Sequence, residues 1–327
     1  RLNKNVGEWD WDALANNFSE KELLDFGFLE DEIPTKNRTD SEGLIPDDKI
    51  PDLIEPIAKY GDIWQMGKHR LMCGDSTSVN QIKKLANKKT IDLIVTDPPY
   101  GVDYEDSQER TIKNDELKDN SLFEFYAKFL IGITEHLKEG GCFYVFHADQ
   151  HAYYTRKAVY AAELLLKQCL IWVKHSPVLG RQDYNWQHEP ILYGWKPGAA
   201  HYFCGDFTNH TLIDDETNLN SMKKTELLEL IEKIKTEENN TALRFNRPYR
   251  NEMHPTTKPV KLIKKLIINS SKEKQIVTDL FMGSGSTLIA AEATNRICYG
   301  MELDPHYVDV AVQRWEEYTG KKAKLLK

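Results

Sequence analysis

A short glycine loop between two apolar runs places the strongest constraint on the fold of this chain. The apolar run 275–281 enters the loop Asp279–Ser286, and the residues after the loop have helical spacing. A second apolar run, 297–302, ends at the acidic residue Glu302. A strand, a loop, a helix and a second strand in this order form a β-α-β unit, whose two strands lie parallel in one sheet.

The same loop predicts a nucleotide-like ligand. Glycines let the backbone approach a ligand closely. Glu302 lies 17 residues after Gly285, and an acid at about 20 residues beyond such a loop binds ribose hydroxyls in nucleotide-binding sheets. On these residues alone, NAD and S-adenosylmethionine (SAM) both fit. A tight turn followed by a core-side acid explains the pattern without any ligand.

Apolar runs and helical spacings alternate along the chain from about residue 60. We expect strands at 91–96, 142–146, 168–173 and 191–195, and helices at 122–137 (ended by Gly140-Gly141), 153–166, 222–235, 258–269, 287–293 and 307–319. Alternation of this kind predicts an α/β fold with a largely parallel sheet.

Charge and composition divide the chain into three parts. Residues 1–56 hold 15 acidic and 6 basic residues, whereas the remainder holds 36 and 37. Four prolines among acids predict an extended linker at 34–59, before a folded domain at 60–327. A nearly neutral domain can carry a local basic cleft, so the net charge neither supports nor excludes nucleic acid.

Other features of the composition narrow the class of protein. The five cysteines are widely spaced and include no C-x-x-C pair, which predicts reduced thiols in a cytosolic compartment and no zinc site. No apolar run approaches the roughly 20 residues of a membrane helix. The chain begins with Arg1, so we expect a fragment of a longer protein.

The tetrapeptide Asp97-Pro98-Pro99-Tyr100 directly follows the run 91–96. Ligands of open α/β sheets bind beyond the carboxyl ends of the strands, and the two prolines hold carbonyl acceptors rigidly beside the carboxylate. Adenine N6 held between two such acceptors becomes a nitrogen that can attack a methyl sulfonium. Tyr100 could stack on the base, which contributes roughly 1–3 kcal/mol. An ordinary turn is the alternative, since Asp-Pro commonly starts turns.

Two further motifs are weaker by themselves. His254-Pro-Thr-Thr-Lys-Pro259 could simply start a helix with Thr256 or Thr257 as its cap, and Gly74-Asp75 could be a turn.

Taken together, these motifs resemble the β class of SAM-dependent DNA amino-methyltransferases. The matching blocks are CGDS at 73–76, DPPY at 97–100, HPTTKP at 254–259, DLFMGSGST at 279–287 and GMELDPHY at 300–307, with WVKHSPVLG at 172–180 and HEPILYGWKPG at 188–198. The glycine loop follows the catalytic motif, as in this circularly permuted class. The resemblance covers roughly residues 60–320. It implies a Rossmann-like fold with a mostly parallel seven-stranded sheet and helices on both faces.

The resemblance also implies roles for individual residues. The catalytic residues that hold the target base would be Asp97, Pro98, Pro99 and Tyr100. SAM would be bound by Asp75 (its adenine), Thr256 and Lys258 (its methionine end), Glu302 (its ribose), and Asp279, Phe281, Gly283, Ser284 and Gly285 in the glycine loop. Family members with Asp first in the tetrapeptide mostly methylate adenine N6, whereas Ser there usually marks cytosine N4. Adenine N6 is therefore favoured, with cytosine N4 as the alternative.

In β-class enzymes the segment that corresponds to 200–250 usually holds the target-recognition region. Here it includes Arg244, Arg247 and Arg250 with two aromatic residues, which could contact phosphates or read guanine edges. Surface arginines around a core Phe explain them equally well. The segment is short for a target-recognition region, which predicts that the enzyme recognises a short or loosely defined DNA sequence.

Residues 1–33 resemble the tail of a ParB-like domain that precedes such methyltransferases in some phage and prophage proteins. The resemblance of the rest of the chain to the β-class methyltransferases implies DNA and SAM as partners, with no metal ion and no association with a membrane. It also implies a bacterial or phage-encoded cytoplasmic enzyme that acts at the nucleoid. It leaves a homodimer and a restriction or phage partner open. Two other interpretations are a non-enzymatic DNA-binding module with a vestigial SAM site, and an NAD-dependent oxidoreductase that gives the DPPY and HPTTKP motifs no role.

Overall fold

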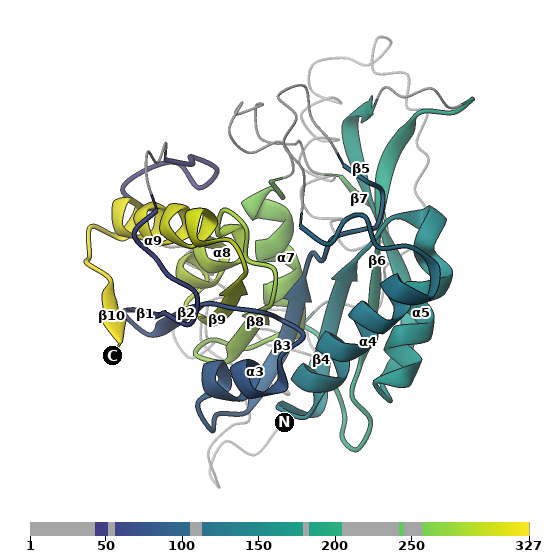
Figure 1. Cartoon of the computed structure of the whole chain (residues 1–327), viewed down its shortest axis with the longest axis horizontal. Helices are drawn as coiled ribbons and strands as arrows, with labels where there is room; N and C mark the ends of the chain where they lie inside the picture. Colours follow the sequence, from purple (N-terminus) through teal and green to yellow (C-terminus); the bar gives the residue numbers. More distant parts are fainter. Residues whose placement is uncertain are drawn as a thin grey trace, which may run out of the picture.

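A computed structural model describes residues 43–51, 56–104, 113–178, 183–204, 242–244 and 257–326. These residues form three layers, in which one β-sheet lies between two groups of helices (Figure 1).

Within the described ranges the sheet has ten strands in the order β10-β1-β2-β9-β8-β3-β4-β6-β5-β7. Their bounds are β1 Ile63–Met66, β2 His69–Cys73, β3 Ile91–Thr96, β4 Leu137–Phe146, β5 Leu165–Val178, β6 Trp186–Trp195, β7 Ala242–Arg244, β8 Ile276–Asp279, β9 Ile297–Glu302 and β10 Lys324–Leu326. The central strands β2, β9, β8, β3 and β4 run parallel. On the two sides, β10, β1 and β2 pair antiparallel, as do β4, β6 and β5, whereas β7 runs parallel to β5.

The Rossmann-like α/β class is confirmed, but the expected mostly parallel seven-stranded sheet is wrong. The described sheet is mixed and has ten strands. Parallel strands that are buried on both faces have nearly continuous apolar sequences, so the central parallel strands could be recognised from the sequence. The outer strands β1 and β10 are half-buried or exposed and carry no such run. Strand direction in β5 and β6 does not show in hydrophobic periodicity.

The helices cover both faces of the sheet. Their bounds are α3 Val79–Ala86, α4 Asp119–Thr134, α5 Ala152–Ala161, α7 Val260–Ser270, α8 Ser286–Ala293 and α9 Pro305–Thr319, with a short 3-10 turn at Asp149–His151. On β3, Leu93 and Val95 pack toward α7, α8 and α9, whereas Ile94 packs toward α3, α4 and α5. This alternation follows from the period of two along a strand and gives each face its own core.

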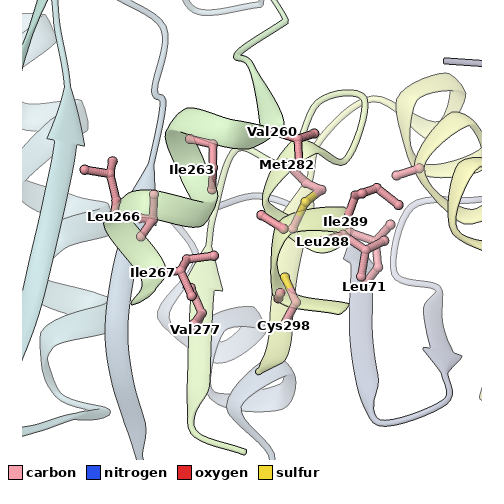
Figure 2. Packing of buried hydrophobic residues seen from close by; sticks show 14 of the residues in the cluster. Leu71, Val260, Ile263, Leu266, Ile267, Val277, Met282, Leu288, Ile289 and Cys298 are labelled. Carbon is pink, nitrogen blue, oxygen red and sulfur yellow. The ribbon is translucent and has the colours of Figure 1, made fainter. Parts of the chain in front are cut away.

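The core under α7 and α8 also anchors the glycine loop. Figure 2 shows Ile267 of α7 and Leu288 of α8 beside Val277 and Cys298 on the strands beneath them, together with Met282 from the loop. The Met282 side chain is 4% exposed. Burying a side chain of this size contributes about 1.5–3 kcal/mol. The loop is therefore attached to the core through one of its own residues.

Two helix ends differ from the expected positions. The helix expected at 122–137 ends at Thr134, and Gly140-Gly141 lies inside β4 rather than ending the helix. A Cβ at Gly140 would lie 2.3 Å from the Ala200 carbonyl oxygen, so glycine is required there by a neighbouring loop. The helix expected at 153–166 ends at Ala161, because Leu165 begins β5. The helix expected at 222–235 lies outside the described residues.

Part of the expected linker at 34–59 contacts the folded body. The Arg314 guanidinium donates to the Asp47 carbonyl oxygen at 2.8 Å, and Asp48 Oδ1 accepts from Val260 N, at the start of α7, at 2.9 Å. The position of the domain boundary at residue 60 stays a prediction. None of the described helices has the length and hydropathy that a membrane crossing requires.

Candidate active site

Four segments that are far apart in the sequence meet at the carboxyl edge of the parallel strands. Asp75 follows β2, Glu302 ends β9, the glycine loop follows β8, and Asp97–Tyr100 follows β3. From β8 the chain continues to β9 on one side, and from β3 to β4 on the other, so the strand order reverses between β8 and β3. Ligands of open α/β sheets bind at such a reversal.

The glycine loop presents open space at one glycine and close packing at the other. Gly283 and Gly285 have φ angles of +51° and +89°, a region that glycine adopts without strain. A Cβ at Gly283 would meet nothing within 4 Å, whereas one at Gly285 would lie 3.1 Å from Ala311 Cβ. Gly283 therefore faces the space beyond the sheet edge, and Gly285 lets the start of α8 approach α9.

Ser284 joins the loop to two neighbouring elements. Its carbonyl oxygen accepts from Arg314 at 2.9 Å, and its hydroxyl lies 3.4 Å from Thr257 Oγ1. Ser284 therefore connects the glycine loop to neighbouring parts of the protein. Its expected contact with SAM stays a prediction.

Glu302 lies beside the glycine loop, at the end of β9. Its Oε2 accepts from Gly283 N at 2.8 Å and its Oε1 from Asp304 N at 2.9 Å. Burial raises the pKa of Glu302, and these two backbone bonds oppose the rise. Each carboxylate oxygen has a second lone pair, so the group can still accept from a pair of hydroxyls. This arrangement is compatible with the ribose-binding role expected for Glu302.

Asp75 lies next to Glu302 across the sheet. Cys73 and Glu302 are paired in the β2–β9 register, and Gly74 N donates to the Glu302 carbonyl oxygen at 2.8 Å. Asp75 Oδ1 accepts from the backbone and hydroxyl of Thr77, both at 2.8 Å. The structure therefore brings Asp75 to the same edge as Glu302 in a defined orientation.

Asp279 is turned into the protein rather than toward the open space. Its Oδ1 accepts from Thr96 Oγ1 at 2.9 Å and its Oδ2 from Thr287 Oγ1 at 2.6 Å. Burial raises the pKa of Asp279 to about 6, against these hydrogen bonds. The carboxylate holds the loop, and its expected contact with SAM stays a prediction. Phe281, next in the loop, contacts the Phe129 ring with centroids 4.9 Å apart.

Asp97 receives hydrogen bonds on both carboxylate oxygens. Tyr100 donates its hydroxyl to Oδ1 at 2.6 Å, and Lys258 Nζ donates to Oδ2 at 2.5 Å. The Asp97 side chain is 26% exposed and that of Lys258 is 9% exposed. The structure thus brings together the DPPY and HPTTKP motifs, 161 positions apart in the sequence. Burial raises the pKa of Asp97, and the Lys258 charge opposes the rise.

Two charged residues of this site were not singled out from the sequence. Glu189 Oε2 lies 3.2 Å from Lys258 Nζ, and Glu189 Oε1 lies 2.5 Å from Lys174 Nζ. Both residues lie in segments noted as family-like, at 188–198 and 172–180. The only local signal for Glu189 is an acidic residue directly before the apolar run of β6, and such a signal is weak.

The tetrapeptide is held by residues of α4 and of the loop before it. Tyr126 donates its hydroxyl to the Pro99 carbonyl oxygen at 2.8 Å. The buried Asp115 carboxylate accepts from Gly101 N at 2.9 Å and from Tyr104 N at 2.7 Å. Asp97 and Tyr100 are therefore presented by a rigid turn.

Several expected site residues cannot be placed. Thr256, Arg247 and Arg250 lie outside the described residues, as do the ParB-like residues 1–33. Of Arg244 only the backbone is described, in β7, which pairs with β5 at the edge of the sheet.

Comparison with known proteins gives one family and several relatives. The DNA methylase model of the N6/N4 methyltransferase type matches residues 91–313. The type II methyltransferase M.HinfI of Haemophilus influenzae is 28% identical over 254 residues, which cover 73% of this chain and 66% of that enzyme. The type II methyltransferase M2.DpnII of Streptococcus pneumoniae is 24% identical, over 79% of this chain and 96% of that enzyme.

Two solved structures share the fold. The putative DNA modification methylase TTHA0409 of Thermus thermophilus, complexed with SAM, has a TM-score of 0.51 and 20% identity, and covers 77% of this chain and 96% of its own. The cytosine-N4-specific PvuII DNA methyltransferase has a TM-score of 0.56 and 15% identity, and covers 78% of this chain and 90% of its own.

Proposed function

Because this chain belongs to the N6/N4 DNA methylase family, whose methyl donor is SAM, we propose that it transfers the methyl group of SAM to N6 of adenine in DNA. The observation that carries this choice of base is the part-buried Asp97 carboxylate directly after β3. Two donors hold it, and its tetrapeptide resembles that of adenine-specific members of the class. The sequence match to DNA methylases leaves the NAD-dependent interpretation without support.

The residues around the glycine loop fit SAM. Gly283 faces open space where a side chain would project, and the Glu302 carboxylate lies beside it. We assign Gly283 and Glu302 to the nucleoside part and Lys258 to the methionine end. When bound, SAM supplies a methyl group on a positively charged sulfur. The carboxylates of Asp75, Asp97 and Glu302 along this edge favour that charge.

Asp97 and a proline carbonyl prepare the amino group of the base. We assign the second acceptor to the Pro98 carbonyl, because Pro98 directly follows Asp97 and Tyr126 already donates to the Pro99 carbonyl. An amino nitrogen between these two acceptors directs its lone pair at the methyl carbon. When bound, SAM would supply the methyl group to this nitrogen and leave as a neutral thioether, and Asp97 would accept the proton that the nitrogen gives up. Positioning supplies much of the acceleration in such a single-step transfer.

The target base reaches this site by leaving the DNA stack. Base flipping costs a few kcal/mol, and stacking on the Tyr100 ring returns roughly 1–3 kcal/mol of it. We propose that Arg244, Arg247 and Arg250 contact the surrounding DNA.

The test is nucleoside mass spectrometry of unmethylated DNA after incubation with this chain and SAM. We expect 6-methyladenine with the intact chain and none with Asp97→Ala. A matched control is Asp92→Ala, which removes the carboxylate near the start of β3, paired with Lys138 at 2.7 Å. This variant should still form product. 4-Methylcytosine instead of 6-methyladenine would refute the assigned base and keep the assigned reaction class.

A further inference from the structure

Four charged side chains lie together at the tetrapeptide, on four separate segments: Asp97 after β3, Lys258 before α7, Glu189 in β6 and Lys174 in β5. Asp97 pairs with Lys258, Lys258 with Glu189, and Glu189 with Lys174, at N–O distances of 2.5, 3.2 and 2.5 Å. The Glu189 and Lys174 side chains are only 12% and 8% exposed. Two positive and two negative charges make the group neutral as a whole.

Such a group is costly for the fold. The effective penalty for removing an ion from water is several kcal/mol, and replacement of buried ion pairs by apolar side chains is often neutral or stabilising. Apolar neighbours are already present, since Lys258 Nζ lies 5.3 Å from the centroid of the Phe146 ring and 5.9 Å from that of Trp172. Stability alone gives no reason to keep Glu189 and Lys174 here.

Glu189 contacts the same two donors that hold Asp97. The Tyr100 hydroxyl lies 2.6 Å from Asp97 Oδ1 and 3.1 Å from Glu189 Oε2. Lys258 Nζ lies within hydrogen-bonding reach of both carboxylates as well. A hydroxyl carries a single proton, so Tyr100 can donate to only one of the two carboxylates at a time. The shorter distance assigns that bond to Asp97 in this structure.

We propose that Glu189 is a positioning residue that takes over the Tyr100 hydroxyl and the Lys258 ammonium when Asp97 accepts the amino group of the target base. The inference rests on the proposed function, because it needs Asp97 to act on an amino group. Each Asp97 oxygen already accepts from one donor, so an incoming amino group competes with Tyr100 and Lys258 for this carboxylate. A second carboxylate within reach of both donors keeps them paired during the exchange, and Lys174 contacts the other oxygen of that carboxylate.

The titratable groups that face Asp97 determine the expected pH dependence. They are Tyr100, Lys258, Glu189, Tyr126 and Asp279. The negative charge of Glu189 raises the pKa of Asp97, and the positive charge of Lys258 lowers it. Replacing Glu189 by a neutral residue should therefore lower the pKa of Asp97 and move the acidic limb of the pH–rate profile to lower pH.

The experiment compares Glu189→Gln, Lys174→Met and the double variant in the full chain. Readouts are kcat at saturating SAM and DNA from about pH 5 to about pH 9, the SAM dissociation constant by calorimetry, and the free energy of unfolding in urea. Glu189→Gln removes the carboxylate that lies 2.5 Å from Lys174 Nζ and should lose stability. The double variant removes both charges and should regain it. Glu189→Asp keeps the charge and should recover part of kcat.

We expect kcat to fall on the order of 10–100-fold in Glu189→Gln and to stay low in the double variant, with SAM affinity within about twofold of the wild type. The acidic limb should move to lower pH in both. If the double variant regains the wild-type kcat, Glu189 serves only to neutralise Lys174 and the proposal is wrong. The double variant also decides the question if Glu189→Gln does not fold. Failure of the proposed function itself shows separately, as absence of 6-methyladenine from the wild-type reaction.

Discussion

Thr96 Oγ1 donates a hydrogen bond to Asp279 Oδ1 across 2.9 Å, although 183 positions separate the two residues. Thr96 ends β3 and Asp279 ends β8, so this bond joins the strand end before Asp97 to the strand end before the glycine loop. Leu280 N also donates to Thr96 Oγ1, at 3.3 Å. This buried pair of side chains therefore helps to fix the base-binding turn relative to the glycine loop, in addition to the backbone pairing of β3 with β8.

Asp279→Asn should make the stability of the fold less dependent on pH. Burial raises the pKa of Asp279 to about 6. A carboxyl group whose pKa is higher in the folded than in the unfolded state favours folding at low pH and loses this contribution as the pH rises through both values. We therefore expect the variant to gain stability relative to the wild type between about pH 4 and about pH 7, by roughly 3 kcal/mol at most.

Urea unfolding of both proteins at several pH values in this window measures the effect. Groups common to both proteins cancel in the difference, and Asn can keep bonds to both threonine hydroxyls. A difference that stays constant across the window would show that Asp279 titrates as an ordinary carboxyl group.

Gly283→Ala and Gly285→Ala should separate ligand binding from stability. Both φ angles are positive, so each substitution adds backbone strain of about 1 kcal/mol. The methyl group at 283 enters open space beside Glu302, whereas the one at 285 lies 3.1 Å from Ala311 Cβ. We expect Gly283→Ala to weaken SAM binding about 10-fold or more, and Gly285→Ala to lose more stability. Calorimetry measures the SAM dissociation constant of each variant, and urea unfolding measures its free energy of unfolding. Equal SAM affinity of Gly283→Ala and wild type would remove this loop from the proposed site.

Two substitutions at Tyr100 should distinguish its hydroxyl from its ring. Tyr100→Phe removes the donor to Asp97 and Glu189 but keeps the aromatic face, so kcat should fall about 10-fold with little change in the KM for DNA. Tyr100→Ala also removes the stacking surface, which contributes roughly 1–3 kcal/mol per base, and should raise the KM for DNA. Steady-state kinetics on the same DNA test both. A KM that does not differ between the two variants would argue against stacking on Tyr100.

Much of the site could be predicted from the sequence, because its residues follow apolar strands. Asp97, Asp279 and Glu302 each stand at or just after the end of a run that became β3, β8 or β9. The carboxyl ends of parallel strands share one edge, so their convergence follows from the fold class. The roles assigned to them came from the resemblance rather than from spacing.

Glu189 and Lys174 could not be predicted in the same way. They lie on the antiparallel strands β6 and β5. In this register Trp172 pairs with Glu189, so Lys174, two residues further along β5, lies on the same face of the sheet as Glu189. Hydrophobic periodicity indicates which residues share a face of a strand, but it does not give the direction of the strand or its neighbours in the sheet. The charged partners found for Glu189 are also distant in sequence, since Lys174 lies on the neighbouring strand and Lys258 lies before α7. Contacts of this kind are specified by tertiary packing alone.

A last prediction concerns a buried pair away from the site. His69 Nδ1 accepts from Cys298 N at 2.8 Å, so Nε2 carries the proton and donates to Glu292 Oε2 at 2.5 Å. Trp315 Nε1 donates to the same oxygen at 3.1 Å. Burial alone would raise the pKa of Glu292, but the His69 and Trp315 bonds lower it to about 2.

Glu292→Gln should therefore cost stability in a pH window opposite to that of Asp279. A carboxyl group with a depressed folded pKa stabilises the fold above its unfolded value, and this contribution is lost as the pH falls through about 4.5 toward 2. We expect the variant to lose about 2 kcal/mol near neutral pH and to approach the wild type in acid. Glu292 lies near the end of α8, and the glycine loop precedes the start of that helix, so kcat per folded molecule should not change. A loss of SAM affinity as large as that of Gly283→Ala would instead show that the far end of α8 controls the glycine loop.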